Sequence, residues 1–85
     1  MRVDVKLFAL ARDRVGAPSL AVDLPEPATV ADLRRSLAAA CPALAPLLPS
    51  LMIAVDSDYA DDARQIPPGA EVAAIPPVSG GRSAP

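Results

Sequence analysis

The feature that most limits the fold of this chain is the alternation of apolar and polar residues at its start. From Arg2 to Ala9 every second residue is apolar, and charged residues separate them until Phe8. Successive side chains of a β-strand point to opposite faces, so this period of two predicts a half-buried strand. The inward face is expected to hold Val3, Val5, Leu7 and Ala9, and the outward face Arg2, Asp4, Lys6 and Phe8.

Later segments repeat strand patterns. Ser19 to Leu24 alternates like the first strand and predicts its antiparallel partner, after a helical turn at 10–15 that Gly16 and Pro18 end. Leu51 to Val55 is a short, nearly continuous apolar run, which is typical of a buried strand. The remaining expected strands are a brief edge strand around Tyr59, within the turn at 56–62, and a last strand from Glu71 to Ile75.

One main helix is expected after the second strand. Thr29 is a suitable N-cap, and Asp32 three residues later supplies an acidic partner and a favourable charge for the helix dipole. Pro42 ends the helix, and 42–50 is expected to be irregular or 3₁₀. The buried stripe at helical spacing is Val30, Leu33, Leu37 and Cys41 or Ala40, which makes Cys41 a small core residue.

Composition excludes several classes of function. The chain of 85 residues has no histidine and one cysteine, so it lacks the commonest general base and the pair needed for a Cys/His nucleophile. A net charge of −2 argues against a nucleic-acid partner, and no apolar run approaches the roughly 20 residues that span a membrane. We expect a cytoplasmic protein with no metal site and no autonomous active site. The acidic cluster Asp56, Asp58, Asp61 and Asp62 is expected to be a solvated turn.

The end of the chain combines proline and glycine in an unusual way. Pro76 and Pro77 favour an extended path, and Gly80 and Gly81 leave a bare backbone that fits a narrow slot. Gly81 is the sixth residue after Ile75, a reach of about 20 Å when extended. We therefore expect a folded domain at 1–76 and a flexible tail at 77–85. A frayed terminus of no function is the alternative.

Strand parity predicts an exposed apolar patch at the root of this tail. In the last strand Val72 and Ala74 are expected in the core, which leaves Ile75 on the opposite face. Phe8 has the same parity in the first strand. If the two strands are neighbours, Phe8 and Ile75 lie side by side on the sheet face that lacks the helix, with Tyr59 near them. Such a patch is typical of a partner-binding surface.

The order of the elements is that of a β-grasp (ubiquitin-like) domain. This α+β fold has a mixed sheet of four to five strands with one main helix packed on one face, and its first and last strands are parallel neighbours at the centre. Over residues 1 to 81 the chain resembles the small subunit of molybdopterin synthase, the MoaD-type sulfur carriers. The matching residues are Phe8, Ala11-Arg12, Gly16, 29–34, 52–56, 68–73 and, most specifically, Ile75-Pro76-Pro77-Val78-Ser79-Gly80-Gly81.

The resemblance implies a function in molybdenum cofactor biosynthesis. A MoeB-type enzyme would use ATP to adenylate the Gly81 carboxylate, and a sulfur donor would convert it to a thiocarboxylate. The tail, with Pro76, Pro77, Val78, Ser79 and Gly80, would enter a MoaE-type large subunit in a heterotetramer and deliver sulfur to cyclic pyranopterin monophosphate. Phe8, Tyr59 and Ile75 would contact the large subunit or the activating enzyme, and no cofactor would be bound by this chain itself.

The chain departs from the family pattern after the second glycine. Arg82-Ser83-Ala84-Pro85 follow Gly81, and an amidated Gly81 has no carboxylate to adenylate. Two interpretations stay open: a processing protease removes residues 82–85, or the chain as written is inactive as a sulfur carrier. Three alternatives stay open, namely a related β-grasp sulfur carrier, a modifier that is conjugated to other proteins, and a non-catalytic β-grasp binding module.

Overall fold

The computed structural model describes residues 1–77. Its strands lie within two residues of the predicted bounds at each end, and the predicted 3₁₀ character of 42–50 is confirmed. The elements within 1–77 are β1 (Arg2–Leu7), α1 (Ala9–Val15), β2 (Ser19–Asp23), α2 (Val30–Ala40), the 3₁₀ turns Pro42–Leu44 and Leu48–Ser50, β3 (Met52–Val55), β4 (Asp58–Ala60) and β5 (Val72–Ile75).

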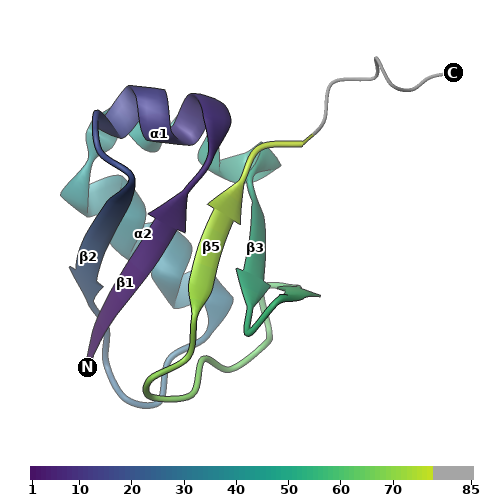
Figure 1. The fold of residues 1–85 in the computed structure, drawn as a ribbon. Helices are drawn as coiled ribbons and strands as arrows, with labels where there is room; N and C mark the ends of the chain where they lie inside the picture. Colours follow the sequence, from purple (N-terminus) through teal and green to yellow (C-terminus); the bar gives the residue numbers. More distant parts are fainter. Residues whose placement is uncertain (78–85) are drawn as a thin grey trace, which may run out of the picture.

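The five strands form one mixed sheet in the order β2-β1-β5-β3-β4. The first and last strands, β1 and β5, are parallel neighbours at its centre, and all other pairs are antiparallel (Figure 1). This arrangement confirms the β-grasp prediction. Because β5 runs parallel to β1, it ends beside the start of α1. The chain leaves the sheet at this end of the central strands.

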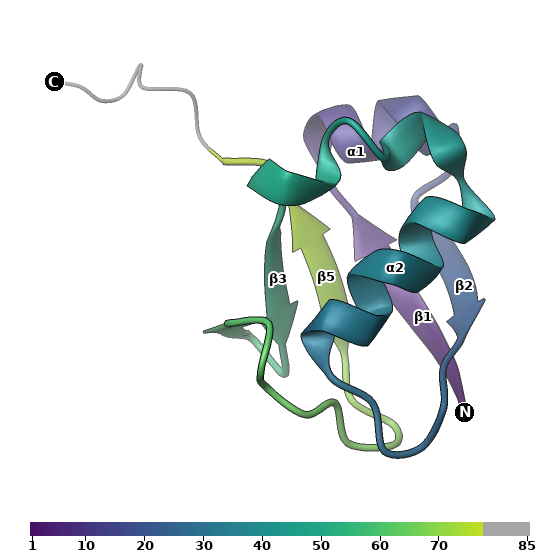
Figure 2. The same cartoon turned by 180° about the vertical axis from the view of Figure 1, so that it is seen from behind.

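Helix α2 packs across one face of the sheet and leaves the other face open (Figure 2). Its stripe of Val30, Leu33 and Leu37 is fully buried, as predicted. Cys41 at its C-terminal end is only half-buried, and Ala40 is exposed, so the stripe ends one turn earlier than expected. Cys41 packs against the edge of the core, which Leu44 and Leu48 from the 3₁₀ turns complete.

The predicted cap of α2 is present. The backbone N–H of Thr29 donates to Asp32 Oδ2 at 2.9 Å, and the Asp32 N–H donates to Thr29 Oγ1 at 3.3 Å. The hydrogen bond from the Thr29 backbone lowers the pKa of the Asp32 carboxyl from its ordinary value, and the neighbouring Arg35 acts in the same direction. Aspartate thus serves in place of the usual glutamate, because its shorter side chain still reaches the N-cap amide.

The first strand ends earlier than its alternation suggested. Phe8 is the extended N-cap of α1, and Ala9 has a φ of 51°, which breaks the strand parity and starts the helix. Ala9, expected inward, is exposed, and Ala11 takes the buried position instead. The Phe8 amide still donates to the Ala74 carbonyl at 3.3 Å, so Phe8 continues the contact with β5 and keeps its outward direction.

A tight hairpin joins β3 to β4. Asp56 and Ser57 have φ values of 50° and 72°, which makes a two-residue turn of the kind that suits the twist of hairpin strands. The predicted acidic cluster is exposed, and Asp56, Asp61 and Asp62 also accept hydrogen bonds that hold the surrounding loops. Within residues 1–77 no helix has both the length and the apolarity that a membrane crossing requires.

Candidate functional site

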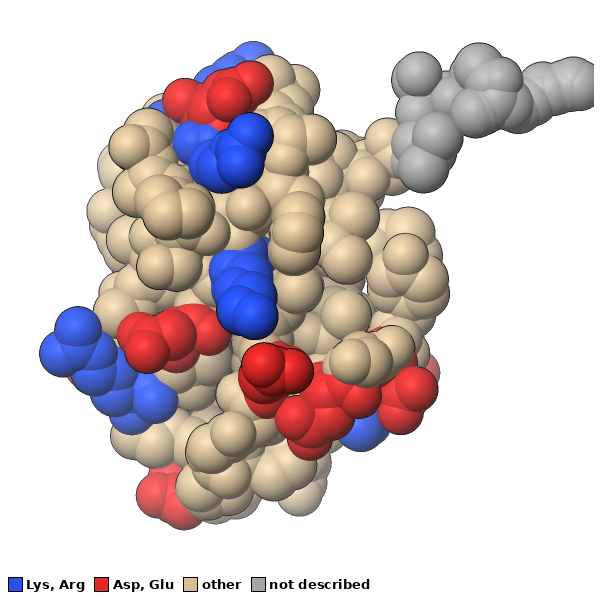
Figure 3. All heavy atoms as spheres, viewed as in Figure 1, with Lys and Arg blue, Asp and Glu red and all other residues tan. Residues whose placement is uncertain are grey.

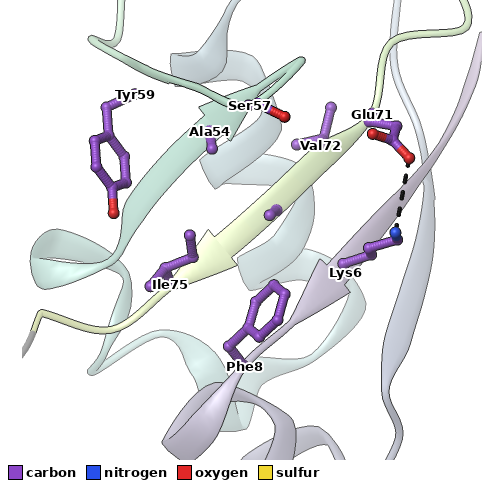
Figure 4. Close-up of a pocket in the computed structure, with 9 residues that line it drawn as sticks. Lys6, Phe8, Ala54, Ser57, Tyr59, Glu71, Val72 and Ile75 are labelled. Atoms are coloured by element: carbon purple, nitrogen blue, oxygen red, sulfur yellow. Dashed lines mark ion pairs between the residues drawn. The ribbon is translucent and has the colours of Figure 1, made fainter.

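A shallow groove of about 330 Å³ lies on the open face of the sheet, beside the root of the C-terminal segment. The three predicted patch residues all line it, and they come from three different elements: Phe8 precedes α1, Tyr59 lies on β4, and Ile75 ends β5 (Figure 4). Phe8 is 46% exposed and Tyr59 65% exposed, whereas Ile75 is half-buried. The structure therefore confirms that these residues share one exposed surface.

The register of the ladders explains the shape of the groove. Ala73 on β5 lies opposite Lys6 of β1 on one side and Ala54 of β3 on the other, and Ala54 in turn faces Tyr59 of β4. Side chains at paired positions share a face of the sheet, so these four form one row across it. Two methyl groups in the middle of the row, between larger side chains, leave a hollow floored by Ala54 and Ala73.

The next row of the sheet makes an apolar wall. Ile75 on β5 is paired with Met52 on β3, and Phe8 lies on the other side of β5. We name the surface formed by Phe8, Met52, Tyr59 and Ile75 the sheet-face patch. Met52 is 42% exposed, although the sequence predicted a buried strand there. No sequence signal identified it, because its place beside Ile75 depends on the pairing of β3 with β5.

An exposed ion pair lies at the groove. Lys6 Nζ lies 3.7 Å from Glu71 Oε2, and both side chains are largely exposed. Figure 3 shows acidic side chains gathered below a central basic side chain, and an uncharged surface between that side chain and the C-terminal segment. A partner that covers the patch thus meets an apolar surface next to the tail and an ion pair farther from it.

The tail root is the last part of the site that the structure describes. Pro76 is half-buried and Pro77 is exposed where the chain leaves β5. The predicted roles of Val78, Ser79, Gly80 and Gly81 lie outside the described residues. Within 1–77 no cluster of three His, Cys, Asp or Glu side chains has the geometry of a metal site.

Comparison with known proteins places this chain in a family. The model of the ThiS family matches residues 5–81. The molybdopterin synthase sulfur carrier subunit of Caenorhabditis elegans is 35% identical over 81 residues, which is 93% of this chain and 96% of that protein. The protein of the same name from Arabidopsis thaliana is 31% identical over 95% of this chain and 84% of its own length.

A solved structure agrees with the fold. SAMP1, a small archaeal modifier protein from Haloferax volcanii, superposes with a TM-score of 0.83 at 29% identity and covers 95% of this chain and 100% of its own. Both kinds of match extend over nearly the whole sequence. The chain therefore belongs to the ThiS family, together with relatives named as molybdopterin synthase sulfur carrier subunits.

Proposed function

We propose that this chain is the sulfur carrier subunit of a molybdopterin synthase. The observation that carries the proposal is the continuity of the sheet-face patch with the tail root. Phe8 and Ile75 lie where β5 leads into Pro76 and Pro77, and the sequence continues to Gly80-Gly81. A partner that covers the patch is therefore adjacent to the segment that carries the reacting group.

The patch is the expected binding surface for a MoaE-type large subunit. It offers large apolar side chains that are exposed in the isolated chain, around a hollow whose alanine floor admits a side chain of the partner. Binding removes this apolar area from water, which is the main favourable term in protein association. The names of the relatives describe a subunit, which agrees with a partner of this kind.

The chemistry is assigned to Gly81. Its carboxylate attacks the α-phosphorus of ATP on a MoeB-type activating enzyme, which releases pyrophosphate and leaves an acyl-adenylate. A sulfur donor then displaces AMP and forms the thiocarboxylate, whose sulfur is transferred to cyclic pyranopterin monophosphate in the large subunit. Glycine at positions 80 and 81 lets the partner close around backbone alone. Catalytic groups come from the partners, and this chain carries the sulfur.

Activation requires a free carboxylate, and here Gly81 is followed by Arg82. We therefore include a maturation step in the proposal, in which a protease hydrolyses the amide between Gly81 and Arg82. All described strands and helices end by Ile75, so the loss of 82–85 leaves the domain unchanged.

The test compares residues 1–85 with residues 1–81 in ATP–pyrophosphate exchange with the cognate activating enzyme. Exchange is expected only with the shorter form, and addition of a sulfur source should raise its mass by the replacement of one oxygen by sulfur. Gly81→Val in the short form should abolish thiocarboxylate formation without unfolding the domain. Equal exchange by both forms, with residues 82–85 still attached afterwards, would contradict the maturation step. Absence of exchange in both forms would leave a non-catalytic binding module.

A second function is favoured by the similarity to SAMP1, whose name describes a modifier protein. A modifier uses the same activated glycine but transfers it to a lysine amine of another protein. Isolation of the chain from its host, followed by mass mapping of Gly81, separates the two functions. Gly81 joined to lysines of unrelated proteins would favour the modifier, and a free or thiolated Gly81 would favour the sulfur carrier.

A further inference from the structure

The chain contains a single lysine. Seven of its eight basic residues are arginine, and Lys6 is the exception. The guanidinium of arginine stays protonated at every physiological pH, so arginines are poor nucleophiles toward an activated carbonyl. Lys6 is thus the only side-chain amine that an activated glycine carboxylate can acylate.

Lys6 is exposed beside two hollows of the surface. Its side chain is 64% exposed on the open sheet face and lines the groove floored by Ala54 and Ala73 (Figure 4). It also lines a second hollow, together with Gly69 and Ala70. The lining of the first hollow includes Ala54 and Ala73, and that of the second includes Gly69 and Ala70. An extended segment without side chains, such as a diglycine tail, can lie in them and bring its last carbonyl to the lysine.

The other amine in the chain is less available. The Met1 ammonium group is half-buried and donates to the Leu24 carbonyl at 2.6 Å, which continues the β1–β2 ladder. Acylation at Met1 would have to break this contact and displace the end of the strand. Lys6 gives up only an exposed ion pair with Glu71, which contributes about 0–1 kcal/mol.

We propose that Lys6 is the acceptor for the activated tail of a second copy of this chain, and that its acylation and the docking of the large subunit exclude one another. The inference rests on the proposed function, because it requires the acyl-adenylate of Gly81. The neutral Nζ of Lys6 attacks that carbonyl carbon, the bond to the phosphate oxygen breaks, AMP leaves, and the nitrogen loses its proton to water. The product is a dimer joined by one isopeptide bond, in which the acceptor copy has lost its Lys6 amine and the donor copy keeps its own.

Exclusion follows from where Lys6 lies. It is paired with Ala73 in the row that borders the sheet-face patch, so a second chain attached there covers the surface that the large subunit would bind. Conversely, a docked large subunit covers Lys6. A carrier bound to the large subunit is thereby protected from acylation at Lys6. Free activated carrier reacts to form a dimer, and the acylated copy of that dimer cannot bind the large subunit.

The experiment incubates residues 1–81 with the cognate activating enzyme and ATP, without a sulfur source, and maps the products by mass spectrometry. A dimer linked through Lys6 is expected, with a mass of two chains less one water. Lys6→Arg should remove the dimer and leave pyrophosphate exchange unchanged. Large subunit at about ten times its Kd should reduce the dimer about tenfold, because only about a tenth of the carrier stays free.

A relocated lysine tests the role of the hollows. The double variant Lys6→Arg, Arg12→Lys keeps one lysine but moves it to the exposed surface of α1. It should form about tenfold less dimer, because the amine no longer lies beside the hollows that hold the tail. Equal dimer from this variant, linkage through Met1, or dimer formation that the large subunit does not reduce would each overturn the proposal.

Failure of activation is distinguishable from failure of this inference. Exchange without any dimer contradicts the role of Lys6 and leaves the carrier function intact. Absence of exchange contradicts the carrier function, and Lys6 is then tested with residues 1–81 that carry a synthetic C-terminal thioester. Linkage to Lys6 in that form supports the inference, and linkage elsewhere or none refutes it.

Discussion

Asp56 and Glu71 are joined by a pair of hydrogen bonds across the end of the sheet. The Asp56 amide donates to the Glu71 carbonyl at 2.8 Å, and Asp56 Oδ1 accepts the Glu71 amide at 3.0 Å. This pair fastens the hairpin that carries Tyr59 to the start of β5, which carries Ile75. Two sides of the sheet-face patch are therefore held in register by one aspartate at the turn.

We expect Asp56→Ala to destabilise the fold by about 1 kcal/mol, because the Glu71 amide loses its acceptor. Alanine also tolerates the φ of 50° at this position less well than aspartate or asparagine. Asp56→Asn keeps the acceptor oxygen and also tolerates the positive φ, so it should retain most of the stability. Urea unfolding measures the difference. Asp58→Ala is the control, and an equal loss in it would show that the hydrogen-bond pair has no special role.

Phe8→Asp should weaken large-subunit binding strongly and change stability by no more than about 0.5 kcal/mol, because the side chain is exposed. Leu10 offers a matched control, since it is 44% exposed, close to the 46% of Phe8, but does not line the groove. Binding is measured by calorimetry and folding by urea titration. Equal weakening by Leu10→Asp would show that the patch is not the binding surface.

Ala73→Leu tests the hollow itself. The added side chain points to the open face, where it fills the space above Ala54 without entering the core. The domain should keep its stability within about 0.5 kcal/mol, because a half-exposed position has room for a larger group. Affinity for the large subunit should fall, because a side chain of the partner can no longer enter. Unchanged affinity would show that the large subunit contacts the rim of the groove and inserts no side chain into the hollow.

Acid should weaken the cap of α2 through Asp32. Its pKa is lower in the folded chain than its ordinary value of 3.8, so it contributes stability that is present above that value and is lost as the pH falls through the folded pKa. Asp32→Asn should therefore lose stability near neutral pH and show a smaller further loss when the pH falls below about 4. Asp23→Asn is the control, since its carboxylate makes no hydrogen bond within residues 1–77. Urea midpoints as a function of pH give the comparison, and parallel curves for wild type and Asp32→Asn would refute it.

Gly16→Ala should cost about 1 kcal/mol, because Gly16 ends α1 with a φ of 82° that alanine adopts poorly. No heavy atom lies within 4 Å of an added Cβ, so the cost is conformational rather than steric. Gly16→Asn should lose less, since asparagine tolerates this conformation. Thermal unfolding of the two variants tests the ranking, and equal losses would point to another cause.

The sequence alone determined most of the fold, because its strongest patterns are local. Alternation placed Val3 and Val5 inward, and Thr29 with Asp32 marked the start of α2. These signals depend on backbone geometry within a few residues, and the tertiary contacts of the fold are compatible with them. The prediction that Phe8 and Ile75 lie on the same face of the sheet is also confirmed, although Phe8 is a helix cap rather than a strand residue.

What only the tertiary structure decided is the detail of the site. Ala9 has a φ of 51° because the chain turns there from β1 into α1, and no local sequence pattern predicted this turn. Met52 belongs to the patch because β3 lies antiparallel to β5 with Met52 opposite Ile75, a register set by long-range pairing. The hollow beside Lys6 exists because two alanines from strands β3 and β5, far apart in the chain, meet in one row. Patterns along a strand indicate which face a side chain takes, whereas its neighbours across the sheet are fixed only when the strands pair.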